Sequence, residues 1–130
     1  MKWKLLVLTL GLPLALLAAD QPAQFNADSD GKSVILKPGD RFDLTLPENA
    51  TTGYGWEVVE GLNGVIRQLG EPEFRSNRPD KHKVGVGGTV TYHFQATGAG
   101  TTLLKLVYHR RWEKDKPPVK TFQLTVTVSL

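Results

Sequence analysis

Hydrophobic and polar residues alternate along several short runs of this chain. In residues 41–46, Phe42, Leu44 and Leu46 lie on one side of an extended backbone, and polar residues lie on the other. A period of two predicts a strand with one buried face. Comparable runs occupy residues 33–36, 54–59, 89–96, 101–108 and 119–130, and residues 65–69 and 73–75 form one interrupted run.

These runs predict an all-β domain. Beyond the N-terminal segment no sustained helical period appears, and turn residues separate the runs. About seven short strands favour an immunoglobulin-like antiparallel β-sandwich, with a small closed barrel as the main alternative. Residues 101–108 carry Leu104 and Leu106 on one face and Leu103 and Val107 on the other. A strand that is apolar on both faces is expected in the centre of its sheet.

The connections between the expected strands alternate between long and short. If consecutive strands run antiparallel, every second connection returns to the same end of the sheet. The three long loops would then share one end, where binding function is most often found. The long connections are residues 47–53, 76–88 and 109–118, and the short turns are residues 37–40, 60–64 and 97–100.

The N-terminus has the pattern of a secretory signal peptide. A short basic start is followed by an apolar stretch of 13 residues, 5–17, and then by two alanines. The apolar run is shorter than the roughly 20 residues of a membrane span. We therefore expect a signal peptide at residues 1–19, export to the periplasm or the medium, and no membrane association after its removal. Residues 20–32 are expected to form a flexible arm, and residues 33–130 a single domain.

Charge and cysteine content exclude several classes of function. The chain has 16 basic and 13 acidic residues, and without Lys2 and Lys4 of the expected signal peptide the basic count is 14. This near balance, without a basic stripe, argues against nucleic-acid binding. The absence of cysteine excludes thiol catalysis and Cys-ligated metals. His82, His93 and His109 have no metal-ligand spacing, and no catalytic constellation is present. We expect neither an enzyme nor a cofactor.

The three long loops carry distinct chemistry. Asn and Thr side chains in residues 49–54 can bond to nearby backbone, and Gly53 permits a positive φ, which suits either a narrow tip for a cleft or a plain connection. Residues 85–88 contain three glycines that expose backbone, for pairing with a partner or as a simple loop end. Arg110 and Trp112 are residue types enriched at binding hot spots, although Trp112 could also cap the sandwich.

Three segments in these loops resemble the signature loops of the chagasin family, which are inhibitors of papain-like cysteine peptidases. The family pattern is Asn-Pro-Thr-Thr-Gly-aromatic, then Gly-x-Gly-Gly, then Arg-Pro-Trp. Counterparts of all three occur here in the same order, within an all-β domain of suitable length that is expected to be exported. The segments are Asn49-Ala50-Thr51-Thr52-Gly53-Tyr54, Gly85-Val86-Gly87-Gly88 and Arg110-Arg111-Trp112.

The resemblance implies a wedge of three loops that blocks the peptidase cleft reversibly and without a covalent bond. The first loop would enter the cleft, with Thr51 and Thr52 nearest the catalytic Cys and His. The second would lie along one wall, where Lys83 and Val84 also touch the enzyme. The third would grip the opposite wall through Trp112. The implied partners are papain-like cysteine peptidases, and the protein is expected to be a monomer.

Two residues depart from the family pattern. Ala50 and Arg111 each stand where the family has proline. Proline fixes φ, so its loss at position 50 corresponds to about 0.4–1 kcal/mol of lost preorganisation. Arg111 raises the same concern for the orientation of Trp112 and adds a charge that would tune target choice. Arg110 would support Trp112 from within the loop.

Two other functions remain open at this point. An exported β-sandwich could bind carbohydrate by stacking Tyr54, Trp56 and Trp112 on sugar rings. Trp56 shares the apolar face of its expected strand with Tyr54 and Val58, which favours a place in the core instead. The domain could also be a structural module whose loops have no binding role.

Overall fold

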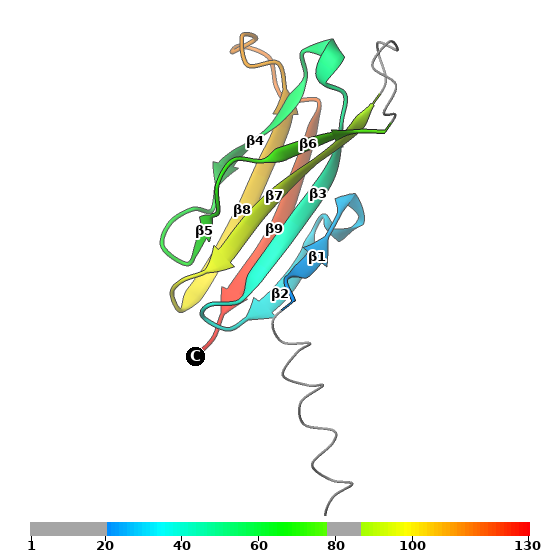
Figure 1. Cartoon of the computed structure of the whole chain (residues 1–130). Helices are drawn as coiled ribbons and strands as arrows, with labels where there is room; N and C mark the ends of the chain where they lie inside the picture. The colour runs from blue at the N-terminus through cyan, green and yellow to red at the C-terminus, as the bar shows by residue number, and fades with distance from the viewer. Residues whose placement is uncertain (1–20, 78–86) are drawn as a thin grey trace, which may run out of the picture.

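The computed structural model describes residues 21–77 and 87–130, and these residues form a two-layered β-sandwich (Figure 1). The signal peptide expected at residues 1–19 lies outside the described residues, and so do four of the expected contact residues: Lys83, Val84, Gly85 and Val86.

Nine strands and two 3-10 turns make up the described part of the chain, and no α-helix occurs in it. One sheet has the order β1-β3-β7-β5, with β6 also paired to β7, and the other has the order β2-β9-β8-β4. The strands are β1 (Ala23–Phe25), β2 (Lys32–Leu36), β3 (Arg41–Glu48), β4 (Gly55–Glu60), β5 (Ile66–Gln68), β6 (Glu73–Ser76), β7 (Gly88–Ala96), β8 (Gly100–His109) and β9 (Lys120–Val128), and the turns are η1 (Ala27–Ser29) and η2 (Ala50–Thr52).

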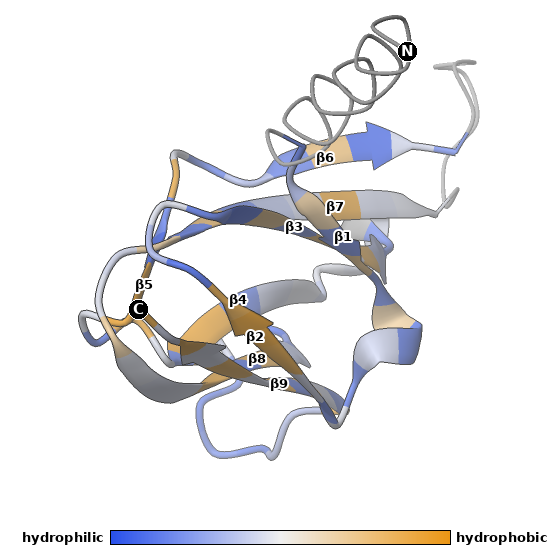
Figure 2. Ribbon diagram, turned by 90° about the horizontal axis from the view of Figure 1, so that it is seen from below, coloured by the Kyte–Doolittle hydropathy of each residue, from blue (hydrophilic) through white to orange (hydrophobic). Residues whose placement is uncertain are grey.

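The core lies between the two sheets, which Figure 2 shows as separate layers. Buried and partly exposed residues alternate along β3, β7 and β9, as their sequence pattern predicts. Phe42 and Phe94 stack across β3 and β7, with ring centroids 5.0 Å apart. β8 has a neighbour on each side, so its expected central position is confirmed. The predicted all-β sandwich is therefore confirmed.

The strand count and the pairing differ in detail from the prediction of about seven antiparallel strands. β5 and β6 pair with successive parts of β7, so residues 65–69 and 73–75 do form one interrupted strand. β1 pairs with β3 in parallel, and β2 pairs with β9 in parallel. Both exceptions involve short strands at a sheet edge, where one neighbour suffices and either direction satisfies the backbone.

The N-terminal segment corrects a further expectation. Residues 20–32 were expected to be a flexible arm outside the domain, but β1, η1 and the start of β2 lie within them. The ring of Phe25 packs edge-on against Phe42 at 5.7 Å. The backbone N–H of Gln123 donates to Asp30 Oδ1 at 2.8 Å. Long-range backbone pairing, an aromatic contact and side-chain hydrogen bonds attach this segment, and none of them leaves a periodic pattern in the sequence.

The long and short connections separate to opposite ends of the sandwich (Figure 1). The short turns after β2, β4 and β7 share one end. The loop after β3, the loop after β8 and the described ends of β6 and β7 share the other. The expected clustering of the loops is confirmed for the described residues. None of the helical turns in residues 21–77 and 87–130 is long or apolar enough to cross a membrane.

Candidate functional site

The first loop is held in shape by its own polar side chains. Asn49 Oδ1 accepts hydrogen bonds from the backbone N–H of Thr51 at 3.2 Å and from its hydroxyl at 2.7 Å. The hydroxyl of Thr52 donates to the carbonyl oxygen of Asn49 at 2.7 Å. These are the local side-chain bonds that the sequence predicts for Asn and Thr in a turn. The η2 turn, which begins at Ala50, is thus fixed before any partner binds.

Gly53 brings the first loop into contact with the third. Its φ is 82°, in the left-handed region that favours glycine. A Cβ atom at this position would lie only 2.5 Å from Cη2 of Trp112. Gly53 is therefore required twice, once by its backbone conformation and once by the indole ring that lies against it.

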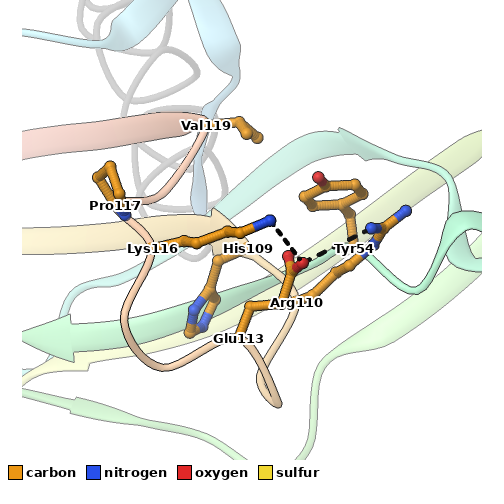
Figure 3. A pocket seen from close by; sticks show the side chains of 7 residues that line it. All are labelled: Tyr54, His109, Arg110, Glu113, Lys116, Pro117 and Val119. Atoms are coloured by element: carbon orange, nitrogen blue, oxygen red, sulfur yellow. Dashed lines mark hydrogen bonds and ion pairs between the residues drawn. The ribbon is translucent and has the colours of Figure 1, made fainter.

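Arg110 fastens the two loops together. Its Nε–H donates to the carbonyl oxygen of Thr52 at 3.2 Å. Its guanidinium carbon lies 4.4 Å from the ring centroid of Tyr54 and 5.9 Å from that of Trp112. Figure 3 shows the guanidinium beside the ring of Tyr54. A planar cation that donates along its edge and stacks on its face is well suited to such a junction.

The third loop makes a tight turn at Arg111 and Trp112. The backbone N–H of Glu113 donates to the carbonyl oxygen of Arg110 at 3.0 Å. The carboxylate of Glu113 lies 3.9 Å from the guanidinium of Arg110 and 3.3 Å from the ammonium of Lys116 (Figure 3). This arrangement keeps Arg110 directed towards the first loop.

A column of aromatic rings supports the first loop from below. Tyr108 lies 5.0 Å from Trp56 and 5.6 Å from Tyr54, measured between ring centroids. The hydroxyl oxygen of Tyr108 accepts a hydrogen bond from the backbone N–H of Asn49 at 3.1 Å. The sequence pattern predicts Tyr108 only as an inward-facing strand residue and does not reveal this role. The available signal was an inward-facing tyrosine at a strand end, because a buried tyrosine hydroxyl usually has a polar partner.

The two described glycines of the second loop have different surroundings. Gly88 is buried, and a Cβ there would collide with the carbonyl oxygen of Arg75 and lie 2.8 Å from the ring of Phe74. Gly88 thus allows β6 to pack against β7. Gly87 is less confined, with one side-chain atom 3.8 Å from such a Cβ. Both glycines and Asn49 line the same hollow, so the described end of the second loop lies near the first loop.

Exposure divides the expected site residues into two groups. The exposed members can contact a partner directly, and Trp112 has 68% of its surface accessible, as its sequence context predicts. Tyr54 and Arg110 are half-buried and hold the exposed members in place. The exposed members are Thr51, Thr52, Gly53, Arg111 and Trp112.

Ionisable clusters occur away from the loops. On the outer face of the sheet, His93 Nδ1 lies 2.7 Å from Asp43 Oδ1, and His93 Nε2 lies 3.1 Å from Glu73 Oε2. The hydrogen bond to Asp43, with a further contribution from Glu73, raises the pKa of His93. No group of three or more His, Cys, Asp or Glu side chains in residues 21–77 and 87–130 is placed to hold a metal ion.

The sequence matches a known family of peptidase inhibitors. Residues 35–126 match the family described as Chagasin family peptidase inhibitor I42. The chain is 32% identical to Chagasin of Trypanosoma cruzi over 84 residues, which cover 64% of this chain and 76% of that protein.

Solved structures of cysteine protease inhibitors share the fold. The inhibitor EhICP2 from Entamoeba histolytica superposes with a TM-score of 0.71 at 22% identity, covering 82% of this chain and 95% of EhICP2. PbICP-C, solved in complex with falcipain-2, superposes with a TM-score of 0.50 at 18% identity, covering 85% of this chain and 92% of that one.

Proposed function

The chain belongs to the chagasin family of peptidase inhibitors, and from this membership we propose that it inhibits papain-like cysteine peptidases by reversible occlusion of the active-site cleft. The family consists of inhibitors and not of enzymes. A relative of the same fold, PbICP-C, was solved in complex with falcipain-2, a papain-like cysteine protease. That complex supports the same class of target for this chain.

The observation that carries the proposal is the junction of the first and third loops. Thr51 and Thr52 are exposed at the tip of a loop whose backbone is fixed by its own hydrogen bonds. Arg110 and Trp112 hold that loop from the side. A segment that is already ordered loses little conformational entropy when it enters a cleft, which favours tight binding.

The remaining loop residues supply the walls of the proposed wedge. Trp112 offers a large exposed aromatic surface, which is the kind of side chain that dominates binding energy at interfaces. Arg111 lies beside it and presents a positive charge to the target. Gly88 begins β7 at the same end of the sandwich, and we place the backbone of Gly87 beside a wall of the peptidase cleft.

The proposed inhibition is noncovalent. The chain contains no cysteine, so it cannot form a disulfide with the catalytic thiol of the target. Its η2 turn presents a folded backbone to the cleft. Blocking by shape alone predicts that active peptidase is recovered when the complex dissociates.

Export and a monomeric state complete the proposal. The basic and then apolar start of the chain supports passage through a secretory pathway into the periplasm or the medium. The N-terminal β1 and β2 are short edge strands, which supports a monomer because short edges offer little backbone for pairing between molecules.

Titration of papain with the purified protein tests the proposal. We expect stoichiometric loss of hydrolysis of a fluorogenic peptide at nanomolar concentrations, and recovery of activity after large dilution. Trypsin, a serine peptidase, is the control and should keep its activity. Unchanged papain activity at micromolar concentrations of folded protein would contradict the proposal. Glycan binding in that case would favour the carbohydrate-binding alternative.

A further inference from the structure

Tyr108 connects the core of the sandwich to the start of the first loop. It lies one residue before the end of β8, and only 9% of its surface is accessible. Its hydroxyl oxygen accepts the backbone N–H of Asn49, which is 59 positions away in the sequence. Asn49 in turn accepts the bonds from Thr51 and Thr52 that shape the loop. The hydroxyl of Tyr108 thus fixes the residue on which the loop is built.

The same side chain also contacts the other end of the loop. The ring of Tyr108 stacks on Tyr54 with an interplanar angle of 21°. Its other aromatic neighbour is Trp56, which is buried and belongs to the core. One side chain of β8 therefore touches the first and the last residue of the loop, and it is anchored in the core at the same time.

These contacts close into a ring around the loop. Asn49 accepts from Thr52 through its carbonyl oxygen. Thr52 accepts from Arg110 through its own carbonyl oxygen. Arg110 lies over Tyr54, and Tyr54 stacks on Tyr108. Because the contacts form a closed ring, loss of the bond between Tyr108 and Asn49 would loosen the conformation of the whole loop.

We propose that Tyr108 is a positioning residue of the inhibitory wedge, one that sets the conformation of residues 49–54 without touching the peptidase. The inference rests on the proposed function for its effect on inhibition. Tyr108 is buried beneath the loop, so a partner at the tip does not reach it. Ala50 places no restriction of its own on φ, so the bond to Tyr108 adds order to a loop that its own hydrogen bonds shape only in part.

The test compares Tyr108→Phe with a matched control, Tyr92→Phe. Each variant removes one hydroxyl that is hydrogen-bonded to a backbone group, at 3.1 Å for Tyr108 and 2.9 Å for Tyr92. Tyr92 is also buried, but its hydroxyl donates to the carbonyl oxygen of Trp56 in β4, outside the loop. Both variants keep the aromatic ring. We therefore expect similar small decreases in the urea midpoint of unfolding.

The two variants should differ in binding and in loop order. For Tyr108→Phe we expect the inhibition constant against papain to rise about tenfold, which corresponds to about 1.4 kcal/mol. For Tyr92→Phe we expect a change of less than about twofold. Amide hydrogen exchange of residues 49–54 in the free protein should accelerate in Tyr108→Phe and stay at the wild-type rate in Tyr92→Phe. A merely structural role would move both variants together.

The outcomes separate this inference from the proposed function. Equal inhibition constants for the two variants, with equal exchange at residues 49–54, would overturn the positioning role. If the wild-type protein does not inhibit papain, the proposed function fails, and the exchange measurement alone then decides the role of Tyr108. Faster exchange in Tyr108→Phe only would support it, and equal exchange would overturn it.

Discussion

The two ends of the sandwich are both built from three connections between strands, but different kinds of contact hold them together. At the turn end backbone groups make most of the contacts between the turns, and Thr97 Oγ1 adds a bond to the carbonyl oxygen of Gly64 at 3.0 Å. The N–H of Gly39 donates to the carbonyl oxygen of Ala96 at 2.8 Å, and the N–H of Thr97 donates to that of Val65 at 2.8 Å. Backbone groups are present in every residue, so many sequences could make these bonds.

At the loop end side chains make the connections. Arg110 bonds Thr52, Trp112 lies on Gly53, and Tyr108 holds Asn49. Each of these contacts needs one particular side chain and would be lost in most substitutions. The difference indicates that the loop end depends more on particular side chains than the turn end does. Substitutions at the two ends should therefore have different effects.

Replacement of Trp112 by alanine should give the largest loss of inhibition. An exposed aromatic residue at the centre of an interface typically contributes about 2 kcal/mol or more, which is a factor of roughly 30 in affinity. The free energy of unfolding should change little, because most of the indole surface is exposed in the free protein. The inhibition constant against papain and a urea titration give the two values.

The control for Trp112→Ala is Ile35→Ala. Ile35 is also a large apolar residue and is 75% exposed, but it lies on β2, at the edge of the second sheet. This variant should inhibit like the wild type. Equal inhibition constants for Trp112→Ala and the wild type would show that Trp112 does not belong to the binding surface.

The second comparison uses two glycine variants, one from each end of the sandwich. Gly53→Ala and Gly39→Ala both place alanine at a positive φ, 82° and 92° respectively. Each should therefore lower the free energy of unfolding by about 1–2 kcal/mol. A Cβ at Gly39 meets no atom within 4 Å, whereas a Cβ at Gly53 meets the indole of Trp112. Only Gly53→Ala should displace Trp112 and raise the inhibition constant, by about tenfold.

Urea titration and papain inhibition of the two glycine variants provide the check. If both variants lost inhibition equally, the claim that only the loop end binds the peptidase would be contradicted. It would also fail if Gly53→Ala lost stability alone and kept its inhibition constant.

A pair of threonine variants, one from each end, should show a smaller change in the inhibition constant. Thr51→Ala removes the hydroxyl that bonds Asn49 Oδ1 at 2.7 Å, and Thr101→Ala removes a hydroxyl that bonds Thr127 Oγ1 at 3.0 Å near the turn end. Each bond contributes about 1 kcal/mol or less to stability. We expect Thr51→Ala to weaken papain inhibition about fivefold, because the hydroxyl lies at the tip of the wedge. Thr101→Ala should inhibit normally, and the reverse order would contradict the assignment of the tip.

The smallest effect, a change in stability, should come from substitution of His93, which lies on a sheet between the two ends. His93 has a carboxylate at each ring nitrogen, Asp43 and Glu73, and only the imidazolium can donate to both. Because the pKa of His93 is raised in the folded state, its stabilising contribution is complete below the unfolded pKa of about 6.5 and is lost as pH rises through the folded value.

Urea unfolding at several pH values measures this contribution. The difference in unfolding free energy between the wild type and His93→Gln should be larger at pH about 5.5 than at pH about 8.5. Asp43→Asn should reduce that pH dependence while leaving inhibition intact, since Asp43 faces the outside of the sheet. A difference that is constant with pH would show that the two carboxylates do not favour the charged imidazole.

The sequence predicted most of the scaffold because burial on one face imposes a period of two. β3, β7 and β9 follow that period over their full length. The strand Ala23–Phe25 was not predicted, because β1 is held by backbone pairing, by the ring of Phe25 and by a bond from Gln24 to Asp43, which give no periodic pattern. The position of the loops at one end followed from the alternation of connection lengths, since antiparallel strands leave no other arrangement.

The residues of the wedge were predictable, but its internal support was not. Asn49, Thr51 and Thr52 bond within one short segment, so their local roles can be inferred from residue type. Tyr108 acts through contacts with residues more than 50 positions away. Such contacts depend on the register between β4 and β8, which only the folded structure gives.

The structure also weakens the carbohydrate-binding alternative. Trp56 is 5% exposed, and its indole N–H donates to the carbonyl oxygen of Pro47 at 2.8 Å. Tyr54 is engaged by Tyr108 and by Arg110. Of the three aromatic residues that could stack on a sugar, only Trp112 presents an open surface. A single exposed ring is a weak platform for a glycan and is well suited to a protein cleft.

Amide hydrogen exchange of the protein, alone and saturated with papain, tests the central claim most directly. The account predicts slower exchange in the complex at residues 49–54 and 109–112, and unchanged exchange at the turns 37–40, 60–64 and 97–100. Protection of the turn end or of an outer sheet face, with the loops unaffected, would contradict it.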